Sequence, residues 1–269
     1  MVLLESVPNV SEGRRAQVIE SCADAIRASG AWLLDVSSDP SHNRTVFSIA
    51  GAPATVQDAV LSLFQCALPQ IDLRAHDGVH PRIGAIDVVP FIPLDGATMD
   101  DAVAAATAAG AEVARRFALP VFLYGAAAAS AGRARLEEIR RGQFEGLAAK
   151  LRQPEWRPDF GPSQPHPSAG ATVIGAREAL VAYNVNLATD RLDIAKAIAA
   201  TVRERSGGLP FVKALGLALP HRGIVQVSMN LTNFRATSIR QAFDAVASAA
   251  TRRGVAVLES EIVGLQRQN

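Results

Sequence analysis

The spacing of apolar residues along the first half of the chain predicts an alternation of strands and helices. In chain order the elements are a strand over residues 3–10, a helix with Val18, Cys22 and Ile26 on its apolar face, strands over 31–36 and 44–49, a helix on Val56, Val60, Leu63 and Phe64, and a strand over 83–92. Apolar positions three or four residues apart mark one face of a helix, whereas short apolar or alternating runs mark strands. The predicted order is strand, helix, strand, strand, helix, strand.

The same order returns in the second half of the chain. It comprises a strand over residues 180–187, a helix on Ile194, Ile198 and Val202, strands over 211–219 and 224–231, a helix on Ile239, Phe243 and Val246, and a strand over 255–263. This order is that of the split βαβ, ferredoxin-like unit, in which two helices cover one face of a four-stranded antiparallel sheet. The sequence therefore predicts an α+β fold, a tandem pair of ferredoxin-like subdomains with a cleft between them for a small molecule.

The first half carries an extension. Thr98 and Asp101 have the spacing of a capping box and predict a helix to about residue 117, followed by a strand over 121–124 and a helix over 133–150. Five prolines then exclude regular structure from the loop 153–170, which is either a stiff linker or a preformed loop over the cleft. We place the first subdomain at 1–174, with its extra helices within 98–150, and the second at 175–269.

Charge and cysteine content narrow the functional classes. The 27 basic and 26 acidic residues among 269 give a net charge of +1, which provides no field to recruit nucleic acid or an anionic membrane. The Ala-rich run 102–111 is too short to span a bilayer. Cys22 and Cys66 have no Cys-x-x-Cys partner and read as buried thiols of a reducing compartment. With no signal peptide pattern at the N-terminus, we expect a cytoplasmic protein.

Candidate chemistry begins with His76 and His80, which precede the predicted strand 83–92. Their spacing matches a zinc-binding helix, but nearby glycine and proline residues make a helix improbable and the glutamate of that motif is missing. A loop would instead hold His80 at the mouth of the strand, beside Arg82 as a fork-shaped donor for a carboxylate. The alternative is a turn histidine satisfied by a backbone carbonyl.

A second polar cluster lies between two predicted strands. Asp39, His42, Asn43 and Arg44 offer a carboxylate, an imidazole, an amide and a guanidinium within six residues. Such a stretch is either a solvated turn or part of a site. Arg44 begins a strand and is an anion-binding candidate.

Four further polar residues fall on apolar strands. Asn9 and Asn186 occupy equivalent places in the two halves, and each is either a structural tie or a ligand contact. Asp35 and Asp87 require an arginine, a histidine or a ligand nearby, because a buried carboxylate is costly when unpaired. The chain has no phosphate-binding loop, nucleophile elbow or dinucleotide fingerprint, which removes the main support for kinase, hydrolase and nicotinamide functions.

Seven segments of the chain carry a family resemblance: ESVPNVSEG at 5–13, DPSHNRTV at 39–46, HDGVHPRIGAIDVVPFIP at 76–93, DFGPS at 159–163, GAR at 175–177, AYNVNL at 182–187 and QVSMNL at 226–231. In this order they closely resemble the glutamate formiminotransferases. The resemblance covers nearly the whole chain. It implies transfer of the formimino group from N-formimino-L-glutamate to N5 of tetrahydrofolate in histidine degradation, with folate held between two ferredoxin-like subdomains. It also implies a homodimer. We expect no metal ion, because the segment of His76 and His80 does not fit a zinc-binding helix.

The resemblance also carries site residues over by position. His80 corresponds to the catalytic acid/base. The folate-contacting loop comprises Gly161, Pro162, Ser163, Gln164, Pro165, His166, Pro167, Ser168, Ala169 and Gly170. Beside these, we expect the substrate-binding residues to comprise Asn9, Asp35, Asp39, His42, Asn43, Arg44, His76, Arg82, Tyr183, Asn184 and Asn186. The chain departs from the family pattern at residues 164–166 and 169. The sequence ends at Asn269, so we expect deamination to be carried out by another protein.

We hypothesise that His80 takes the proton from N5 and returns it to the departing glutamate nitrogen. Arg44 and Arg82 would hold carboxylates, and Asp35, Asp39, Asn9 or Asn184 would orient the amidinium. Three alternatives stay open: N-formylglutamate as the donor, metal-assisted amidine hydrolysis by His42, His76 and His80, and a non-catalytic module that binds folate or an amino acid.

Overall fold

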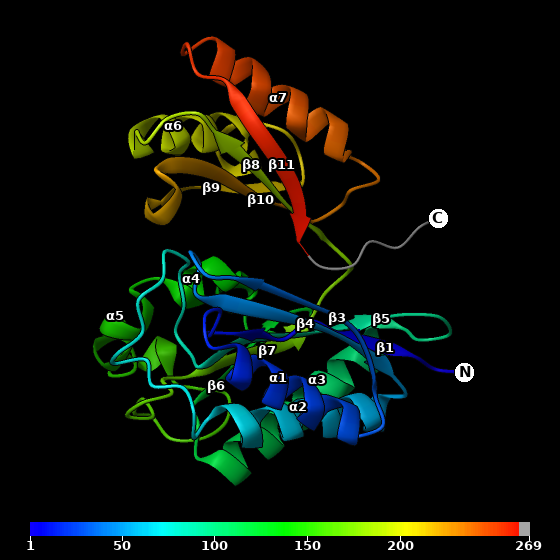
Figure 1. The fold of residues 1–269 in the computed structure, drawn as a ribbon. Helices are drawn as coiled ribbons and strands as arrows, with labels where there is room; N and C mark the ends of the chain where they lie inside the picture. The colour runs from blue at the N-terminus through cyan, green and yellow to red at the C-terminus, as the bar shows by residue number, and fades with distance from the viewer. Residues whose placement is uncertain (264–269) are drawn as a thin grey trace. The chain divides into compact units, whose positions relative to one another are not determined.

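The protein, seen in a computed structural model that describes residues 1–263, consists of two compact units (Figure 1). The first unit comprises Met1–Arg177 and the second begins at Glu178. Each contains one sheet, and the predicted α+β class with two subdomains is confirmed. Up to Val263, no helix is long and apolar enough to cross a membrane.

The first unit is built on a seven-stranded sheet. Its strands are β1 (Leu4–Ser6), β2 (Asn9–Val10), β3 (Trp32–Asp39), β4 (Arg44–Gly51), β5 (Ile86–Pro93), β6 (Val121–Gly125) and β7 (Thr172–Ala176). β1 and β2 lie end to end between β4 and β5, and β3 pairs with β4, which is the antiparallel order of a ferredoxin-like unit. The predicted single strand 3–10 is divided because Pro8 has no N–H to donate to a neighbouring strand.

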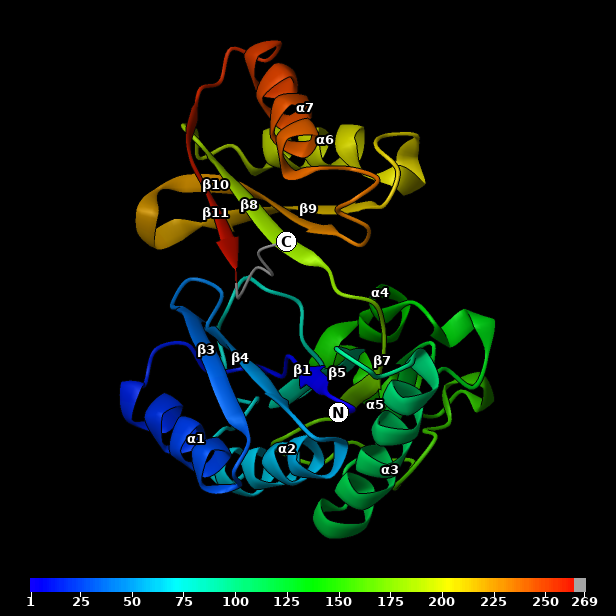
Figure 2. The same ribbon diagram turned by 90° about the vertical axis from the view of Figure 1, so that its right-hand side faces the viewer.

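Three helices cover one face of this sheet: α1 (Ala16–Ala28), α2 (Pro53–Ala67) and α3 (Met99–Phe117) (Figure 2). The positions that predicted α1, among them Val18, Cys22 and Ile26, are buried in the shared core. The capping box of Thr98 and Asp101 at the start of α3 is present in full. Helical periodicity therefore located this layer correctly.

The predicted helix over 133–150 is wrong. The segment forms a short turn η1 (Ala131–Arg133) and two helices, α4 (Leu136–Arg140) and α5 (Gln143–Lys150). They are separated at Gly142, whose φ of 89° lies in the left-handed region that glycine adopts without strain. α4 and α5 cover the face of β5, β6 and β7 opposite to α3, where a second cluster of buried residues includes Val88, Phe122 and Val173.

Strand β7 was not predicted. It lies parallel to and between β5 and β6, and together with β6 it extends the antiparallel core by two strands. The turn η2 (Pro154–Trp156) and an irregular segment lead into it. β5 also begins three residues later than predicted. The preceding residues bond elsewhere: the Ile83 N–H donates to the Asp87 Oδ1 (2.7 Å), and the Ala85 N–H donates to the Ala169 carbonyl.

The second unit has the strand order β11–β8–β10–β9, all antiparallel. Its elements are β8 (Val181–Leu187), α6 (Leu192–Val202), η3 (Glu204–Ser206), β9 (Val212–Leu219), η4 (Pro220–Arg222), β10 (Ile224–Leu231), α7 (Ile239–Thr251) and β11 (Val257–Val263). Both helices pack on the same face of the sheet through one apolar core. Each of its strands and α-helices lies close to the range that periodicity predicted, whereas the short turns η3 and η4 were not predicted.

Candidate active site

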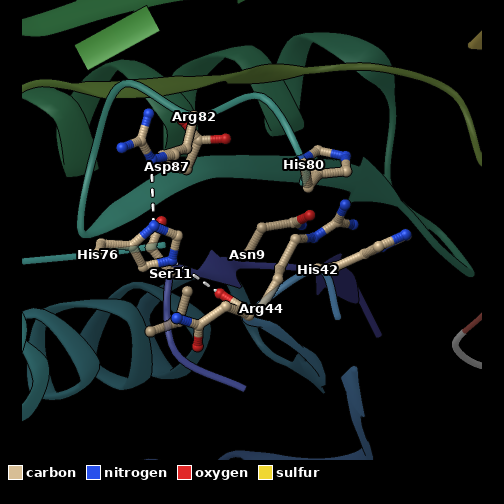
Figure 3. A pocket seen from close by; sticks show the side chains of 10 residues that line it. Asn9, Ser11, His42, Arg44, His76, His80, Arg82 and Asp87 are labelled. Carbon is tan, nitrogen blue, oxygen red and sulfur yellow. Dashed lines mark hydrogen bonds between the residues drawn. The ribbon is translucent and has the colours of Figure 1, made fainter. Parts of the chain in front are cut away.

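A small pocket lies in the first unit, where β2, the turn between β3 and β4, and the loop before β5 meet (Figure 3). It encloses about 200 Å³ of empty space, including solvent at its mouth. The lining residues are Asn9, Val10, Ser11, His42, Asn43, Arg44, His76, His80, Arg82 and Asp87. The structure therefore brings together seven of the residues expected to bind substrate or act in catalysis.

The turn between β3 and β4 owes its shape to two of its own polar side chains. The Asp39 carboxylate accepts hydrogen bonds from the backbone N–H groups of Ser41 (2.7 Å) and His42 (3.0 Å). Asn43, which adopts a φ of 47°, accepts from the Gly13 N–H (2.9 Å) and donates to the Asp77 carbonyl (2.9 Å). Asn43 thus joins three separate segments at the pocket wall, and Asp39 itself lies outside the lining.

His80 is held in a defined tautomer. Its Nδ1 lies 2.9 Å from the Pro81 carbonyl oxygen, which only accepts, so Nδ1 carries the proton. Within residues 1–263, Nε2 has no hydrogen-bond partner and keeps its lone pair. Burial lowers the pKa of His80 well below its ordinary 6.5, and the charges of Arg44 and Arg140 reinforce the effect. His80 is therefore a neutral base at neutral pH, and its ring centroid lies 5.6 Å from that of His42.

His76 has the opposite tautomer. Arg82 Nε donates to its Nδ1 (3.2 Å), so the ring proton lies on Nε2, which donates to the Asn43 carbonyl (3.0 Å). Burial lowers the pKa of His76, and the positive charge of Arg82 lowers it further. Both ring nitrogens are occupied, so His76 serves to connect the loop to the turn.

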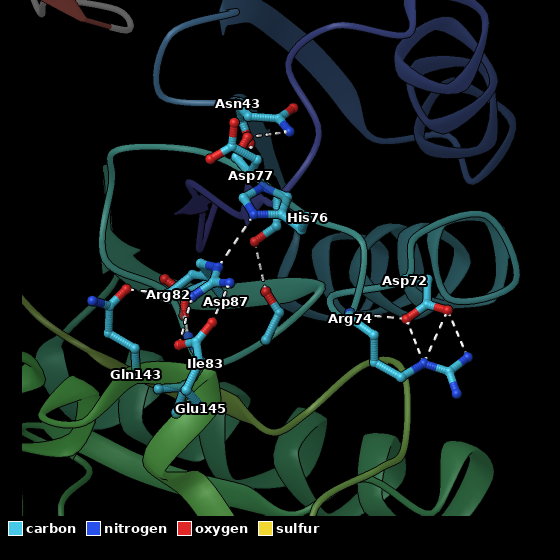
Figure 4. A network of polar contacts seen from close by, with 12 residues as sticks. Asn43, Asp72, Arg74, His76, Asp77, Arg82, Ile83, Asp87, Gln143 and Glu145 are labelled. Carbon is cyan, nitrogen blue, oxygen red and sulfur yellow. Dashed lines mark hydrogen bonds and ion pairs between the residues drawn. The ribbon is translucent and has the colours of Figure 1, made fainter. Parts of the chain in front are cut away.

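Arg82 is engaged on every side of its guanidinium (Figure 4). It forms a bidentate pair with Glu145 of α5, with Nη2–Oε1 and Nη1–Oε2 distances of 2.7 and 3.0 Å. Nη1 also donates to Gln143 Oε1 (3.3 Å), and Nε contacts His76. The fork that was expected to hold a substrate carboxylate is filled by protein groups.

The opposite side of the pocket has an excess of positive charge. The sequence predicted a partner for the Asp87 carboxylate. The carboxylate accepts hydrogen bonds from the Ile83 N–H and from Arg140 of α4. Among residues 1–263, the buried Arg44 Nε and Arg140 Nε have no hydrogen-bond partner. Burial lowers the pKa of Arg44 to about 10, although Asp87 and Asp39 oppose the shift. Two guanidinium groups beside one buried carboxylate make a site suited to an anion.

Comparison with known proteins settles the family. The model of the formiminotransferase domain, N-terminal subdomain, matches residues 3–177, and the model of the formiminotransferase domain matches residues 182–268. The chain belongs to the formiminotransferase domain family. The resemblance drawn from the sequence motifs is thereby confirmed.

Curated relatives match this formiminotransferase-family chain over almost all of its length. A "Glutamate formimidoyltransferase" of Streptococcus pyogenes serotype M1 is 43% identical, over 98% of this chain and 88% of the relative. A protein of the same name from Thermoplasma acidophilum is 44% identical with the same coverage. A "Formimidoyltransferase-cyclodeaminase" of Sus scrofa is 44% identical over 98% of this chain and 50% of the relative.

Other expected site residues of this formiminotransferase-family chain lie outside the pocket. Asp35 lies on β3 and is not among the lining residues. In the second unit, Tyr183 packs in the apolar core. Asn184 donates to Glu261 Oε1 (3.1 Å) and Asn186 to Glu259 Oε1 (3.0 Å).

The expected folate loop has two different parts. Residues 161–164 are exposed, whereas Ala169 and Gly170 are buried. Backbone hydrogen bonds hold the second part in place. His166 and Gly170 bond to each other, and the Leu73 N–H donates to the Ser168 carbonyl (2.8 Å). None of the ten residues lines the pocket described above.

Sequence reasoning missed Arg140, Gln143 and Glu145, which support the pocket from α4 and α5. They lie on a segment predicted as one continuous helix, and no motif distinguished them from solvated charges. In residues 1–263, no group of three or more histidine, cysteine, aspartate or glutamate side chains could hold a metal ion.

Proposed function

We propose that this protein transfers the formimino group from N-formimino-L-glutamate to N5 of tetrahydrofolate, releasing L-glutamate. Family membership and the names of the relatives support the activity. The observation that carries the proposal is His80, which carries an unprotonated Nε2 and lines the same pocket as Arg44, whose buried Nε has no hydrogen-bond partner among residues 1–263. A neutral base beside an anion site suits a small carboxylate substrate that undergoes proton transfer.

In the proposed reaction, N5 of tetrahydrofolate attacks the amidine carbon of the donor. His80 Nε2 accepts the proton that N5 loses as the tetrahedral adduct forms. The resulting imidazolium gives this proton to the glutamate nitrogen, the carbon–nitrogen bond to glutamate breaks, and His80 returns to its neutral form. Holding both substrates together provides most of the acceleration, and proton transfer adds about a hundred- to ten-thousand-fold.

Arg44 is the proposed ligand for a donor carboxylate. Its buried Nε has no hydrogen-bond partner in the part of the chain up to Val263, and a carboxylate would offset the cost of burying its charge. Asn9 lines the same pocket and is the proposed hydrogen-bond partner of the amidinium. The loop 161–170 is the proposed folate contact, because the family resemblance assigns that role and its residues 161–164 are exposed.

We further propose a homodimer, which the family resemblance implies, located in the cytoplasm, which the cysteine content and the N-terminal sequence favour. Light scattering on the eluting peak of a sizing column measures the oligomeric state directly. A mass of one chain at working concentration would refute the dimer.

A two-substrate assay tests the proposed activity. The purified protein is incubated with N-formimino-L-glutamate or N-formyl-L-glutamate, with and without tetrahydrofolate, and glutamate and the folate adduct are followed by mass spectrometry. Folate-dependent formation of glutamate and the 5-formimino adduct in equal amounts is the expected result. Release of glutamate without folate would indicate a hydrolase, turnover of the formyl donor alone would change the donor, and stoichiometric binding without turnover would indicate a binding module.

A further inference from the structure

A chain of polar contacts connects the surface of α5 to the turn that precedes Arg44 (Figure 4). It runs from Glu145 to Arg82, from Arg82 to His76, and from His76 to the carbonyl of Asn43. The loop that contains His76 and Arg82 also contains His80. The contacts therefore determine where this loop lies relative to the turn.

Glu145 stands outside the pocket. Its side chain is 63% exposed, while that of its partner Arg82 is 10% exposed. Exposed ion pairs contribute little to stability in most proteins. A bidentate pair does, however, fix the plane of the guanidinium, and that plane directs Nε at His76.

The helix that carries Glu145 is itself fastened. Lys150 at the end of α5 donates to the carbonyls of Glu138 (2.7 Å) and Ile139 (2.6 Å) in α4. Its Nζ also lies 4.0 Å from the centre of the Trp156 ring. Glu145 thus extends from a fixed support.

Residues at the far end of the chain of contacts are equally constrained. Asn43 receives the His76 N–H on its carbonyl, and its side chain bonds to Asp77 and Gly13. Arg44 is the next residue, and His80 is four residues beyond His76. The contacts consequently hold the proposed base and the proposed carboxylate ligand at a set separation.

We propose that Glu145 is a positioning residue for the transfer reaction, acting through Arg82 and His76 to hold His80 opposite Arg44. This inference rests on the proposed function. It assigns Arg82 to the support of the loop and leaves Arg44 as the guanidinium that meets the substrate. A displacement of about 1 Å at a reacting group lowers turnover by about a hundredfold, so a distant glutamate can affect kcat without touching substrate.

Steady-state kinetics of Glu145→Gln separates positioning from substrate binding. The amide keeps the size of the side chain but loses the charge-assisted fork, and we expect kcat to fall about tenfold with the KM for the donor within about twofold. Arg82→Lys should show the same pattern, because an ammonium group cannot bond to Glu145 and His76 in one plane. Glu112→Gln, which breaks exposed ion pairs with Arg115 and Arg116 on α3, is the matched control and should leave both constants unchanged.

An unchanged kcat in Glu145→Gln, or a loss confined to the KM for the donor in Arg82→Lys, would overturn the proposal. The second of these results would make Arg82 a substrate ligand. Circular dichroism of each variant tests whether the fold is retained.

A readout independent of turnover distinguishes failure of this inference from failure of the proposed function. Nitrogen-15 spectra of labelled histidine should show wild-type His76 protonated on Nε2, and Glu145→Gln should shift it toward a mixture of tautomers while Glu112→Gln does not. An unaltered His76 spectrum in Glu145→Gln would refute the network. An altered spectrum in a protein whose wild type lacks transferase activity would refute the function and retain the network.

Discussion

The two units contain the same four-strand arrangement but differ in how completely their buried polar side chains are hydrogen-bonded. In the second unit, the amides of Asn184 and Asn186 donate to Glu261 and Glu259, and Gln226 donates to Asn186. In the first unit, Arg44 Nε at the pocket and Arg140 Nε beside Asp87 have no hydrogen-bond partner among residues 1–263. Among side chains of residues 1–263, the buried unpaired atoms are these two and Thr172 Oγ1, all in the first unit.

Part of this difference originates in the extension of the first unit, which carries Arg140 on α4 and Thr172 on β7. α4 and α5 bring Arg140 and Glu145 to the edge of the ferredoxin-like core, whereas the second unit has no such extension up to Val263. Shared topology therefore does not determine where chemistry resides. Polar groups left unpaired by the fold are the ones available to a ligand.

Removing the imidazole of His80 should have the largest effect on activity. His80→Ala deletes the proposed base, and we expect kcat to fall by about a hundred- to ten-thousand-fold with the fold retained. His221→Ala, which changes an exposed histidine of the second unit, should leave kcat unchanged. Wild-type turnover by His80→Ala would remove His80 from the mechanism. It would also remove the reason for placing the chemistry in the first unit.

A neutral amide in place of the Arg44 guanidinium should weaken donor binding. A hydrogen bond to a charged group contributes about 1.5–3 kcal/mol, so Arg44→Gln should raise the KM for the donor by about ten- to a hundredfold. Thermal unfolding should not occur at a lower temperature, because the variant removes a buried charge that lacks a full set of partners. Arg222→Gln, at an exposed pair with Glu259 in the second unit, is the control and should alter neither quantity. An unchanged KM in Arg44→Gln would place the anion site elsewhere.

In the second unit, loss of a paired amide should appear as lost stability. Gln226 is 1% exposed, and its amide donates to Asn186 Oδ1 (3.0 Å). Gln226→Leu leaves that oxygen buried and unsatisfied, and we expect the free energy of unfolding in urea to fall by about 1–3 kcal/mol. Gln70→Leu, at a half-buried amide of the first unit, should cost less than about 0.5 kcal/mol. Equal losses of unfolding free energy in the two variants would show that the paired amide of Gln226 stabilises the fold no more than a half-buried amide does.

Sequence periodicity predicted the parts of the fold whose burial is decided locally. The apolar positions of α1 and α2 recur every three or four residues, and each helix has one buried face. In the second unit the strands alternate between core and polar positions, as Tyr183 and Asn184 do on β8. Such patterns need no knowledge of distant contacts.

The failures had non-local causes. Charges and apolar residues over 133–150 fit one helix, and only tertiary packing against both sides of Gly142 shows that they form two. β7 is five residues long and follows prolines, and its place is set by two parallel neighbours rather than by its own pattern.

The candidate site shows the same limit. The His-Pro-Arg segment was found because it departs from any regular element. Sequence could not show whether the Arg82 fork is free, because its partner Glu145 is 63 residues away, nor that Asp87 pairs with Arg140, which is 53 residues away. Pairing of charges across such separations is a property of the folded chain.

The pH dependence of the reaction should give the smallest effect and the sharpest test of the His80 environment. An ordinary imidazole is about three-quarters protonated at pH 6.0, which would lower kcat/KM about fourfold. Burial and the charges of Arg44, Arg140 and His42 hold the pKa of His80 well below 6.5, so the neutral base persists and kcat/KM should be nearly constant from pH 7.5 to 6.0.

The same lowered pKa affects stability. In the unfolded chain the His80 imidazole binds a proton from about pH 6.5 downward, so the contribution of His80 to stability falls as the pH drops below 6.5 toward the folded pKa. Arg44→Gln removes the largest charge contribution and should move the acidic limb of kcat/KM upward. An acidic limb near pH 6.5 in the wild type would mean that the pocket does not keep His80 neutral.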